Sequence, residues 1–259
     1  RPALSRPMAV HSMELAVRTH TGLLRKSNQD WLEVDGDLGV AVLADGMGGH
    51  RAGEIASRVA VGAAFNQVLP SQREHKDDDA ESRRLVGQAV DAANRALREM
   101  CDVHPELCGM GTTLVLAVFR DGQVFHAHVG DSRLYRVRYG RMRRLTRDHS
   151  LIQRMIDDGM FMNRAAAREA GIRDNVLTRS LGIQREAEVD VGSAVLEVGD
   201  TYLICSDGLH GLVSDSTIAR ILRDPQGDLE QQVQGLVDAA LAAGGHDNIS
   251  AILARPRLD

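Results

Sequence analysis

The sequence predicts an α+β fold: a four-layer α/β/β/α sandwich in which two central, mostly antiparallel β-sheets are flanked by helices. Two observations carry this prediction. Short apolar segments typical of buried strands recur along the chain. Longer segments with apolar residues at three- and four-residue spacing, typical of amphipathic helices, lie between and after them. Such helices bury their apolar stripe against a sheet, so strands in the middle and helices outside are expected.

The predicted strands are apolar or alternating runs bounded by turn residues. They span residues 14–19, 31–34, 38–44, 111–119, 123–129, 188–196, 201–205 and 249–254. The tripeptide Arg120-Asp121-Gly122 is a hairpin signal between two of them, and a second hairpin is expected to turn at Tyr139-Gly140. Hairpins join strands in antiparallel order.

The predicted helices span residues 53–65, 84–100, 151–156, 163–171, 214–222 and 229–241. Between the first two, residues 70–82 are polar and contain Asp77-Asp78-Asp79. No glycine turn or strand fixes these three acids, so we expect a solvated loop rather than a metal site. Residues 148–178 are longer than a typical connection, and long insertions are often functional.

Length and composition bound the domain organisation and the class of protein. With 259 residues, 43% of them hydrophobic, we expect residues 13–259 to form a single domain and residues 1–12 to be a disordered tail or vector-derived. No apolar run approaches the roughly 18 residues of a membrane span. The net charge of -5 argues against nucleic acid as a partner. Three cysteines without CxxC spacing suit a reducing compartment, so the expected location is cytoplasmic.

An apolar run over residues 38–44 ends at Asp45, which three glycines follow within four positions. This pattern is typical of a buried strand that delivers an acid to a site. The glycines allow a sharp turn and a close approach of the backbone to a ligand, which side chains would obstruct. The carbonyl of Gly46 is therefore a candidate ligand as well.

The same pattern recurs at other places in the chain. Asp131 and Asp207 each follow an apolar strand, and Asp247 stands just before one. Antiparallel neighbours would bring all four acids to one end of the sheets. Carboxylates packed together raise one another's pKa, so cations must lie among them.

The donor set favours a hard cation. Carboxylates, carbonyls and water suit Mg²⁺ or Mn²⁺, whereas Zn²⁺ would favour His and Cys at ligand spacing. His126 and His128 lie on the same face of a predicted strand, but no partner His stands at such spacing. We expect these two histidines to pack or to form a hydrogen bond.

Eight motifs, in chain order, resemble those of the metal-dependent serine/threonine protein phosphatases of the PP2C type, in their bacterial form. They are RKSNQD (25–30), ADGMGGH (44–50) with GE (53–54), GTT (111–113), VGDSR (129–133), LTRDHS (145–150), LTRSLG (177–182), CSDGL (205–209) and DNIS (247–250). The resemblance covers residues 14–254, nearly the whole chain, and it implies the same four-layer fold.

The resemblance implies a protein serine/threonine phosphatase that hydrolyses phosphoserine and phosphothreonine by attack of a metal-bridging water, without a covalent intermediate. Its partners would be phosphorylated proteins, including a cognate bacterial Ser/Thr kinase or the targets of that kinase, and the protein is expected to be a monomer. Residues 148–178 would form a mobile flap beside the metal site. The alternative function is a catalytically weak, PP2C-like regulatory module that binds phosphoproteins.

The resemblance also implies the roles of single residues. A core pair of Mn²⁺ or Mg²⁺ ions would be held by Asp45, the Gly46 carbonyl, Asp207 and Asp247, supported through bound water by Asp30. Arg25 matches the phosphate-binding arginine, whose planar fork can take two phosphate oxygens. Asp131 is predicted to serve a third, weaker ion together with Asp207. The predicted catalytic residues are Arg25, Asp45, Asp207 and Asp247.

Two positions depart from the pattern of many relatives. Met47 stands where animal relatives carry a His that protonates the leaving oxygen, so the general acid is unassigned, with His50 or a bound water as candidates. Gln29 replaces a Glu and removes one negative charge near the metals. A serine hydrolase would need an activated nucleophile, but no Gly-x-Ser-x-Gly elbow occurs. The acidic net charge argues against a metal-dependent phosphodiesterase.

The hairpin at 133–147 is strongly basic. Its arginines are Arg133, Arg136, Arg138, Arg141, Arg143, Arg144 and Arg147. Charged side chains on an edge strand prevent pairing with other chains, so a solvated protective face is the expected role. The alternative role is a docking surface for acidic phosphoproteins.

Overall fold

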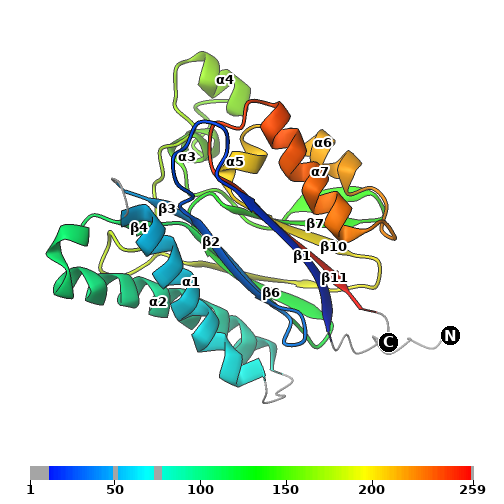
Figure 1. Ribbon diagram of the computed structural model, residues 1–259, viewed down its shortest axis with the longest axis horizontal. Helices are drawn as coiled ribbons and strands as arrows, with labels where there is room; N and C mark the ends of the chain where they lie inside the picture. Colours follow the sequence, from blue (N-terminus) through cyan, green and yellow to red (C-terminus); the bar gives the residue numbers. More distant parts are fainter. Residues whose placement is uncertain (1–11, 49–51, 73–77, 258–259) are drawn as a thin grey trace.

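The computed structural model describes residues 12–48, 52–72 and 78–257. Within them, two antiparallel sheets pack face to face, and helices cover both outer sides (Figure 1). This arrangement confirms the predicted four-layer sandwich. The predicted tail lies outside the described residues apart from Ser12, and so do His50 and Asp77.

Both sheets are built from antiparallel neighbours. The first has the order β1 (Met13–His20), β11 (Ile249–Pro256), β10 (Thr201–Cys205), β7 (Arg133–Arg138), β8 (Arg141–Arg144). The second has the order β2 (Asp30–Asp35), β3 (Val40–Met47), β5 (Leu114–Arg120), β6 (Gln123–Val129), β9 (Asp190–Val195), with β4 (Gly111–Thr112) beside the end of β3. The first and last strands of the chain are thus neighbours, in β1 and β11.

Helices cover the two outer faces. On the second sheet lie α1 (Ala52–Gln72) and α2 (Asp79–Val103), which contact β3 and β6. On the first sheet lie α6 (Asp215–Ile221) and α7 (Leu229–Ala242), of which α7 contacts β1 and β11. No helix of the described chain is long and apolar enough to span a bilayer.

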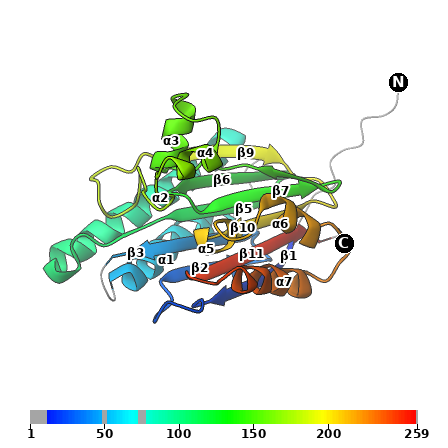
Figure 2. The ribbon, with the colours of Figure 1, turned by 90° about the horizontal axis from the view of Figure 1, so that it is seen from above.

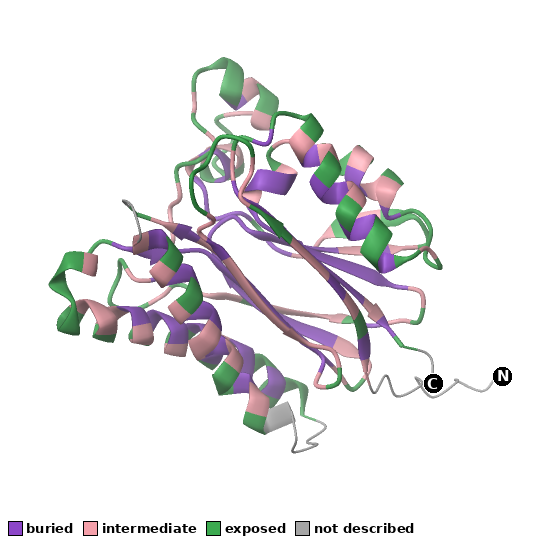
Figure 3. Cartoon of the chain, viewed as in Figure 1, coloured by how far each residue is buried: buried purple, intermediate pink, exposed green. Residues whose placement is uncertain are grey.

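Three separate hydrophobic cores fill the spaces between the four layers. One lies between α1, α2 and the second sheet, one between the two sheets, and one between the first sheet and α6 and α7. The strands are therefore mostly buried, whereas the helices expose their outer faces (Figure 3).

Strand β3 shows why its sequence is apolar without alternation. Val40, Val42 and Ala44 pack toward the helices, and Ala41 and Leu43 pack toward the other sheet. Because successive side chains of a strand point to opposite faces, burial on both faces requires a continuous apolar run. All five residues are fully buried.

The structure corrects several predicted boundaries. The predicted strand 111–119 is divided into β4 and β5 at Thr113, and α1 continues through Pro70, which had been expected to begin a polar loop. The predicted loop extended to residue 82, but α2 already begins at Asp79, because Asp78 caps it by accepting hydrogen bonds from the Ala80 and Glu81 backbone amides. The short helix α5 (Asp207–His210) was not predicted.

Both predicted hairpins are present. The turn at Asp121-Gly122 has positive φ at both residues, 51° and 71°, and so does the turn at Tyr139-Gly140, at 48° and 70°. Two successive positive φ values are typical of the type I′ turn, whose twist matches that of the flanking strands. The second hairpin places β8 at the edge of its sheet.

The arginines of this hairpin were expected to form a solvated face, but only some of them do. Arg141 and Arg143 are exposed on the edge strand, but Arg133 is buried and bonded to Asp148. Arg138 forms a bidentate ion pair with the buried Asp200. The basic character of the hairpin therefore serves internal ion pairs as well as edge protection.

The segment 148–178 lies at one end of the sandwich. It carries α3 (Leu151–Asp157) and α4 (Arg164–Glu169), which contact each other and stand above the strand ends (Figures 1 and 2). Ser150 and Asn163 cap the two helices with their side chains. Both predicted helices are confirmed, and each begins at a polar capping residue.

Candidate functional site

The predicted acids meet at the end of the sheets where α3, α4 and α5 lie (Figure 1). Asp45 lies near the end of β3, Asp131 follows β6, Asp207 follows β10, and Asp247 precedes β11. All four line one cleft of about 480 Å³, together with Arg25. The antiparallel order of the strands thus places the acids together, as the sequence had predicted.

Asp30 joins this group from the neighbouring strand. It is the first residue of β2 and stands directly opposite Asp45 in the register of β2 and β3. Its side chain is buried, and one carboxylate oxygen accepts a hydrogen bond of 2.8 Å from Ser206 Oγ. Asp30 therefore lies behind the cleft rather than in its lining.

Glycines beside two of these acids allow close approaches of backbone segments. A Cβ on Gly46 would lie 2.0 Å from the Gly53 carbonyl oxygen, and one on Gly208 would lie 1.9 Å from the Asn248 carbonyl oxygen. No side chain fits at such distances, so these positions require glycine. The first approach packs the segment of Asp45 against the start of α1, and the second joins the segments that carry Asp207 and Asp247.

Asp30 and Asp131 are buried and the other acids are half-buried, with too little positive charge around them among the described residues. Burial and the neighbouring carboxylates raise the pKa of Asp30 to about 7 and that of Asp131 to about 8. Burial, followed by the charge of Asp30, raises the pKa of Asp45 well above its usual range. Burial and then the charge of Asp247 raise the pKa of Asp207, although a hydrogen bond with Asp45 opposes this. Ionising this cluster at neutral pH requires added cations.

Two buried oxygens of the cluster have no hydrogen-bond partner among the residues that the structure describes: Oδ1 of Asp30 and Oδ1 of Asp207. An orphaned buried carboxylate oxygen is costly unless something else binds it. Oxygen donors of this kind match the coordination preference of Mg²⁺ and Mn²⁺. The residues present therefore fit divalent cations.

Arg25 lies at the mouth of the cleft and is half exposed. Its guanidinium donates a hydrogen bond of 2.8 Å to Asp247 Oδ2. Asn248 holds the loop between β1 and β2 in place. Its side chain donates to the Thr21 and Ser27 carbonyls and accepts from the Gln29 amide. This loop carries Arg25 to the cleft and leads into Asp30 at the start of β2.

The rest of the cleft bears on the unassigned general acid. Met47 and Gly48 line it, and the Gln29 carbonyl accepts a hydrogen bond from the Gly46 amide. A methionine side chain carries no proton to give. His50 lies outside the described residues, so the general acid stays unassigned.

The sequence had offered no partner for His128, but the fold supplies one from the next motif. The rings of His128 and His149 stack with their centroids 4.7 Å apart, and Asp190 lies beside them. His128 Nε2 bonds to the Arg147 carbonyl at 2.8 Å, so this nitrogen carries the proton and the expected hydrogen bond is present. Its Nδ1 is buried without a hydrogen-bond partner among the described residues. His126 packs against Gly192 on the same strand face. Spacing in the chain could not reveal the stack, because its two rings come from segments about 20 residues apart.

This histidine pair has the character of a hydrogen-bond cluster rather than of a second metal centre. His149 Nδ1 accepts from the Gly130 amide at 3.2 Å, so the proton of neutral His149 lies on Nε2, which faces Asp190. The Arg179 guanidinium bonds to Asp190 at 2.9 Å and supplies the positive charge there. Burial lowers the pKa of His128 to about 4, which keeps its ring neutral.

The adjacent residues Asp148, His149 and Ser150 do not form a catalytic triad. The Asp148 carboxylate is bonded to arginines, and the Ser150 hydroxyl accepts from the Gln153 amide at the start of α3. A triad requires the base to bond to both its neighbours. The serine hydrolase alternative therefore lacks its central element.

Comparison with known proteins places the chain in a family. The sequence profile described as "Protein phosphatase 2C" matches residues 20–243. The serine/threonine protein phosphatase PstP of Mycobacterium tuberculosis is 34% identical over 245 residues, which are 93% of this chain and 45% of PstP. The protein phosphatase PhpP of Streptococcus pneumoniae is 35% identical over 244 residues, covering 93% of this chain and 96% of PhpP.

Solved structures agree with these sequence relatives. The catalytic domain of PstP in complex with two manganese ions superimposes with a TM-score of 0.82 at 32% identity, covering 94% of this chain and 98% of that one. The chain spans about half the length of the curated PstP sequence that it matches. Profile, sequence relatives and fold agree over nearly all of the described residues. The chain belongs to the protein phosphatase 2C family.

Proposed function

We propose that this protein is a metal-dependent protein serine/threonine phosphatase that hydrolyses phosphoserine and phosphothreonine in proteins. The observation that carries the proposal is the cleft in which buried acids without countercharge lie beside an arginine. The relatives PstP and PhpP are named as protein phosphatases, and one PstP structure holds two manganese ions. A regulatory module without catalysis would have no need to keep all the acids.

Divalent Mn²⁺ or Mg²⁺ ions would be held by Asp45, the Gly46 carbonyl, Asp207 and Asp247, with Asp30 behind them. When bound, such ions lower the pKa of water and neutralise charge on a transferring phosphoryl group. The chain's own contribution is to hold the carboxylates together through the register of its strands and the glycine contacts. The orphaned oxygens of Asp30 and Asp207 are the atoms that gain a partner.

Arg25 would bind the phosphoryl group of the substrate. Its guanidinium is half exposed and faces the cleft, and its only described hydrogen-bond and ion-pair partner is Asp247. Once Asp247 faces a cation, the planar fork of Arg25 is available for two phosphate oxygens. Arg25 therefore acts by orienting the phosphoryl group above the acids.

Asp131 would serve a third, weaker ion together with Asp207. It also lines an adjoining cleft toward residues 148–178, which Asp45 does not line. A site with few protein ligands holds Mg²⁺ loosely and mostly hydrated. We infer that Asp131→Ala keeps the two tight ions but strongly reduces turnover on phosphopeptides, and metal titration by calorimetry beside a rate assay tests this.

The partners follow from the activity. Phosphorylated proteins would be the substrates, among them a cognate Ser/Thr kinase or the targets of that kinase. The three cysteines form no disulfide, which suits a cytoplasmic enzyme, and we propose a monomer in which residues 13–259 act as one domain with 148–178 as the flap.

The experiment that tests the proposed activity is a hydrolysis assay. The protein should release phosphate from phosphothreonine peptides and from a small aryl phosphate with Mn²⁺ or Mg²⁺, and a chelator should abolish this. Turnover that persists after exhaustive chelation would contradict the proposal. Asp78→Asn is a matched control, because this acid caps α2 away from the cleft and its loss should not change the rate.

A further inference from the structure

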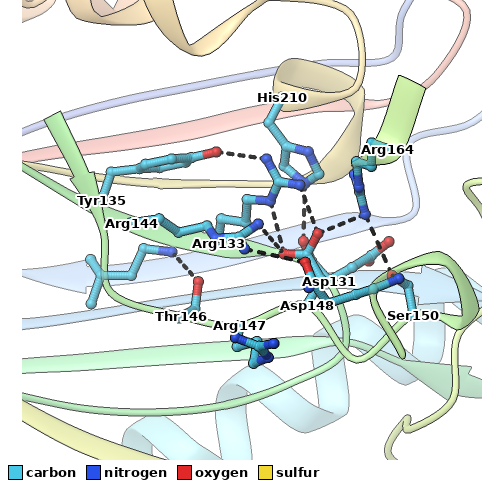
Figure 4. Close-up of polar contacts among 12 residues, drawn as sticks. Asp131, Arg133, Tyr135, Arg144, Thr146, Arg147, Asp148, Ser150, Arg164 and His210 are labelled. Atoms are coloured by element: carbon cyan, nitrogen blue, oxygen red, sulfur yellow. Dashed lines mark hydrogen bonds and ion pairs between the residues drawn. The ribbon is translucent and has the colours of Figure 1, made fainter. Parts of the chain in front are cut away.

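Asp148, the first residue of the 148–178 segment, lies in a cluster of arginines (Figure 4). Its side chain is fully buried, and Arg133 binds it through two nitrogens at 2.9 and 2.6 Å. Arg144 adds a contact of 3.1 Å, and Arg164 adds one of 2.8 Å. One carboxylate thus receives three guanidinium groups.

The three arginines come from different parts of the fold. Arg133 and Arg144 belong to β7 and β8 of the sandwich, whereas Arg164 is the first residue of α4. Arg164 also lies 3.4 Å from the Ser150 hydroxyl, the cap of α3. The side chain of Arg164 therefore ties the start of α4 to the start of the segment and to the sandwich beneath it.

Arg164 is not needed to neutralise Asp148. The bidentate Arg133 already satisfies both carboxylate oxygens, in the strongest geometry that such a pair adopts. The guanidinium of Arg164 adds a third positive charge close to that of Arg133. Burial lowers the pKa of Arg164, and the charge of Arg133 lowers it further, although the charge of Asp148 opposes both. Its Nε is buried without a hydrogen-bond partner. An arginine kept at such a cost points to a purpose other than stability.

The position of α4 matters for the cleft. A second cleft of about 430 Å³ adjoins the first and shares Arg25, Asp131, Asn175, Asp207 and Asp247 with it. Its other wall comes from the 148–178 segment, through Arg164, Arg168, Arg173 and Asp174. Arg168 lies on α4 and pairs with Asp174 in the loop that follows. Where α4 lies therefore determines the shape and charge of the surface beside the acids.

We propose that Arg164 is a positioning residue, which anchors α4 to Asp148 and thereby holds the basic wall against which the protein substrate binds. This proposal rests on the proposed phosphatase function. A phosphorylated polypeptide extends beyond its phosphoryl group and contacts this wall, whereas a small aryl phosphate does not reach it. Losing the anchor should therefore weaken the binding of peptides more than that of the small substrate.

The matched control is Arg144. It binds the same carboxylate, is similarly exposed (29% against 23% for Arg164), and carries the same charge, but it belongs to the sandwich. Arg164→Ala and Arg144→Ala thus remove equal charge from Asp148, and only the first removes the anchor of α4. Arg164→Lys keeps a positive charge within reach of Asp148 and should rescue much of the effect.

The test measures steady-state rates with Mn²⁺ on a phosphothreonine peptide and on an aryl phosphate, together with hydrogen exchange of α4 amides in the metal-free protein. We expect Arg164→Ala to raise KM for the peptide about five- to tenfold, an ordinary size for coupling between sites. KM for the aryl phosphate should change less than about twofold. The α4 amides should exchange faster in Arg164→Ala alone.

Three results would overturn the proposal. Unchanged peptide KM and unchanged α4 exchange would make Arg164 dispensable. Equal losses on both substrates would place its effect at the reacting centre. Equal losses in Arg144→Ala would reduce its role to neutralising Asp148. Hydrogen exchange of the α4 amides is measured in the metal-free protein and needs no catalysis. An inactive wild type would therefore contradict the proposed function, but the anchoring of α4 by Arg164 could still be tested.

Discussion

Two sets of buried carboxylates lie side by side in this protein and differ in how their charge is balanced. In the cleft, Asp30 and Asp131 are buried and Asp45 and Asp207 are half-buried, with too little positive charge beside them, and desolvation raises the pKa of all four. At the start of the 148–178 segment, one carboxylate meets three arginines. Burial alone would raise the pKa of Asp148, but Arg133 and Arg144 lower it to about 2.

The comparison shows which feature distinguishes acids that bind added cations from acids that the protein neutralises itself. Asp30, Asp131 and Asp148 are buried, and Asp45 and Asp207 are half-buried, so loss of solvent by itself does not distinguish the two sets. The difference lies in the countercharge. The protein supplies arginines to Asp148, whereas the cleft acids depend on cations that bind from solution. Removing a charge should therefore have opposite effects on stability at the two places.

The largest expected effect concerns the cleft acids. Replacing Asp45, Asp207 or Asp247 with Asn keeps the shape but removes a charge, so kcat should fall on the order of 10³-fold, because each ion supplies several kcal/mol. Steady-state rates at saturating Mn²⁺ measure this. A variant that keeps near-normal turnover would show that its acid does not hold a metal ion.

The second effect concerns the arginine-bound acid. Asp148→Asn leaves the buried guanidinium of Arg133 and the half-buried ones of Arg144 and Arg164 without their carboxylate, and should lower the free energy of unfolding by about 3–5 kcal/mol. Urea unfolding followed by circular dichroism measures it. The matched control is Asp157→Asn, which breaks an ion pair with Arg147 near the surface and should cost under about 1 kcal/mol. Equal losses in both variants would contradict the comparison.

The third effect is a pH dependence with a defined sign. In the metal-free folded protein Asp30 and Asp131 stay protonated up to about pH 7 and 8, whereas in the unfolded chain they ionise near 3.8. The folded state thus binds more protons, and the stability this provides is lost as pH rises through those values. The melting temperature without metal should fall by at least about 3 °C between pH 6.5 and 8.5.

Excess Mn²⁺ should remove this trend, because metal binding needs the ionised acids. His126 and His128 oppose this trend only at the lower end of the window, because burial lowers their folded pKa values to about 4 while the unfolded chain still loses its histidine protons near pH 6.5. His149 and His210, whose pKa values burial also lowers, act in the same direction, and the opposing contribution is nearly complete by about pH 7.5. A metal-free melting temperature that rises from pH 6.5 to 8.5 would mean that the cleft acids are already neutralised by the protein.

The smallest effect concerns Arg25, which lines the cleft and bonds to Asp247. Arg25→Ala should mainly raise KM, by about tenfold or less, because a phosphate clamp engaged in the ground state contributes largely uniform binding. Arg25→Lys keeps the charge without the fork and should recover only part of the loss. A fall in kcat with unchanged KM would instead place Arg25 in the transition state alone.

Much of this architecture could be predicted from local sequence. Continuous apolar runs indicate strands that are buried on both faces, such as β3. The antiparallel order of the strands then predicts that the acids at their ends lie together. The histidine stack and the arginine cluster could not be predicted. They join side chains from segments that meet only in the folded chain, so spacing carries no sign of them. Nor could the sequence distinguish a solvated Arg141 from a buried Arg133 in one hairpin.

The most direct measurement of the central claim is the melting temperature of Asp207→Asn and of the wild type, at pH 8, with a chelator and with excess Mn²⁺. Without metal, the variant should melt above the wild type, because it relieves repulsion within an uncompensated cluster. Mn²⁺ should raise the melting temperature of the wild type and raise that of the variant much less. If the metal-free variant melts below the wild type and Mn²⁺ raises its melting temperature by the full amount, the cleft acids do not depend on bound cations for their countercharge.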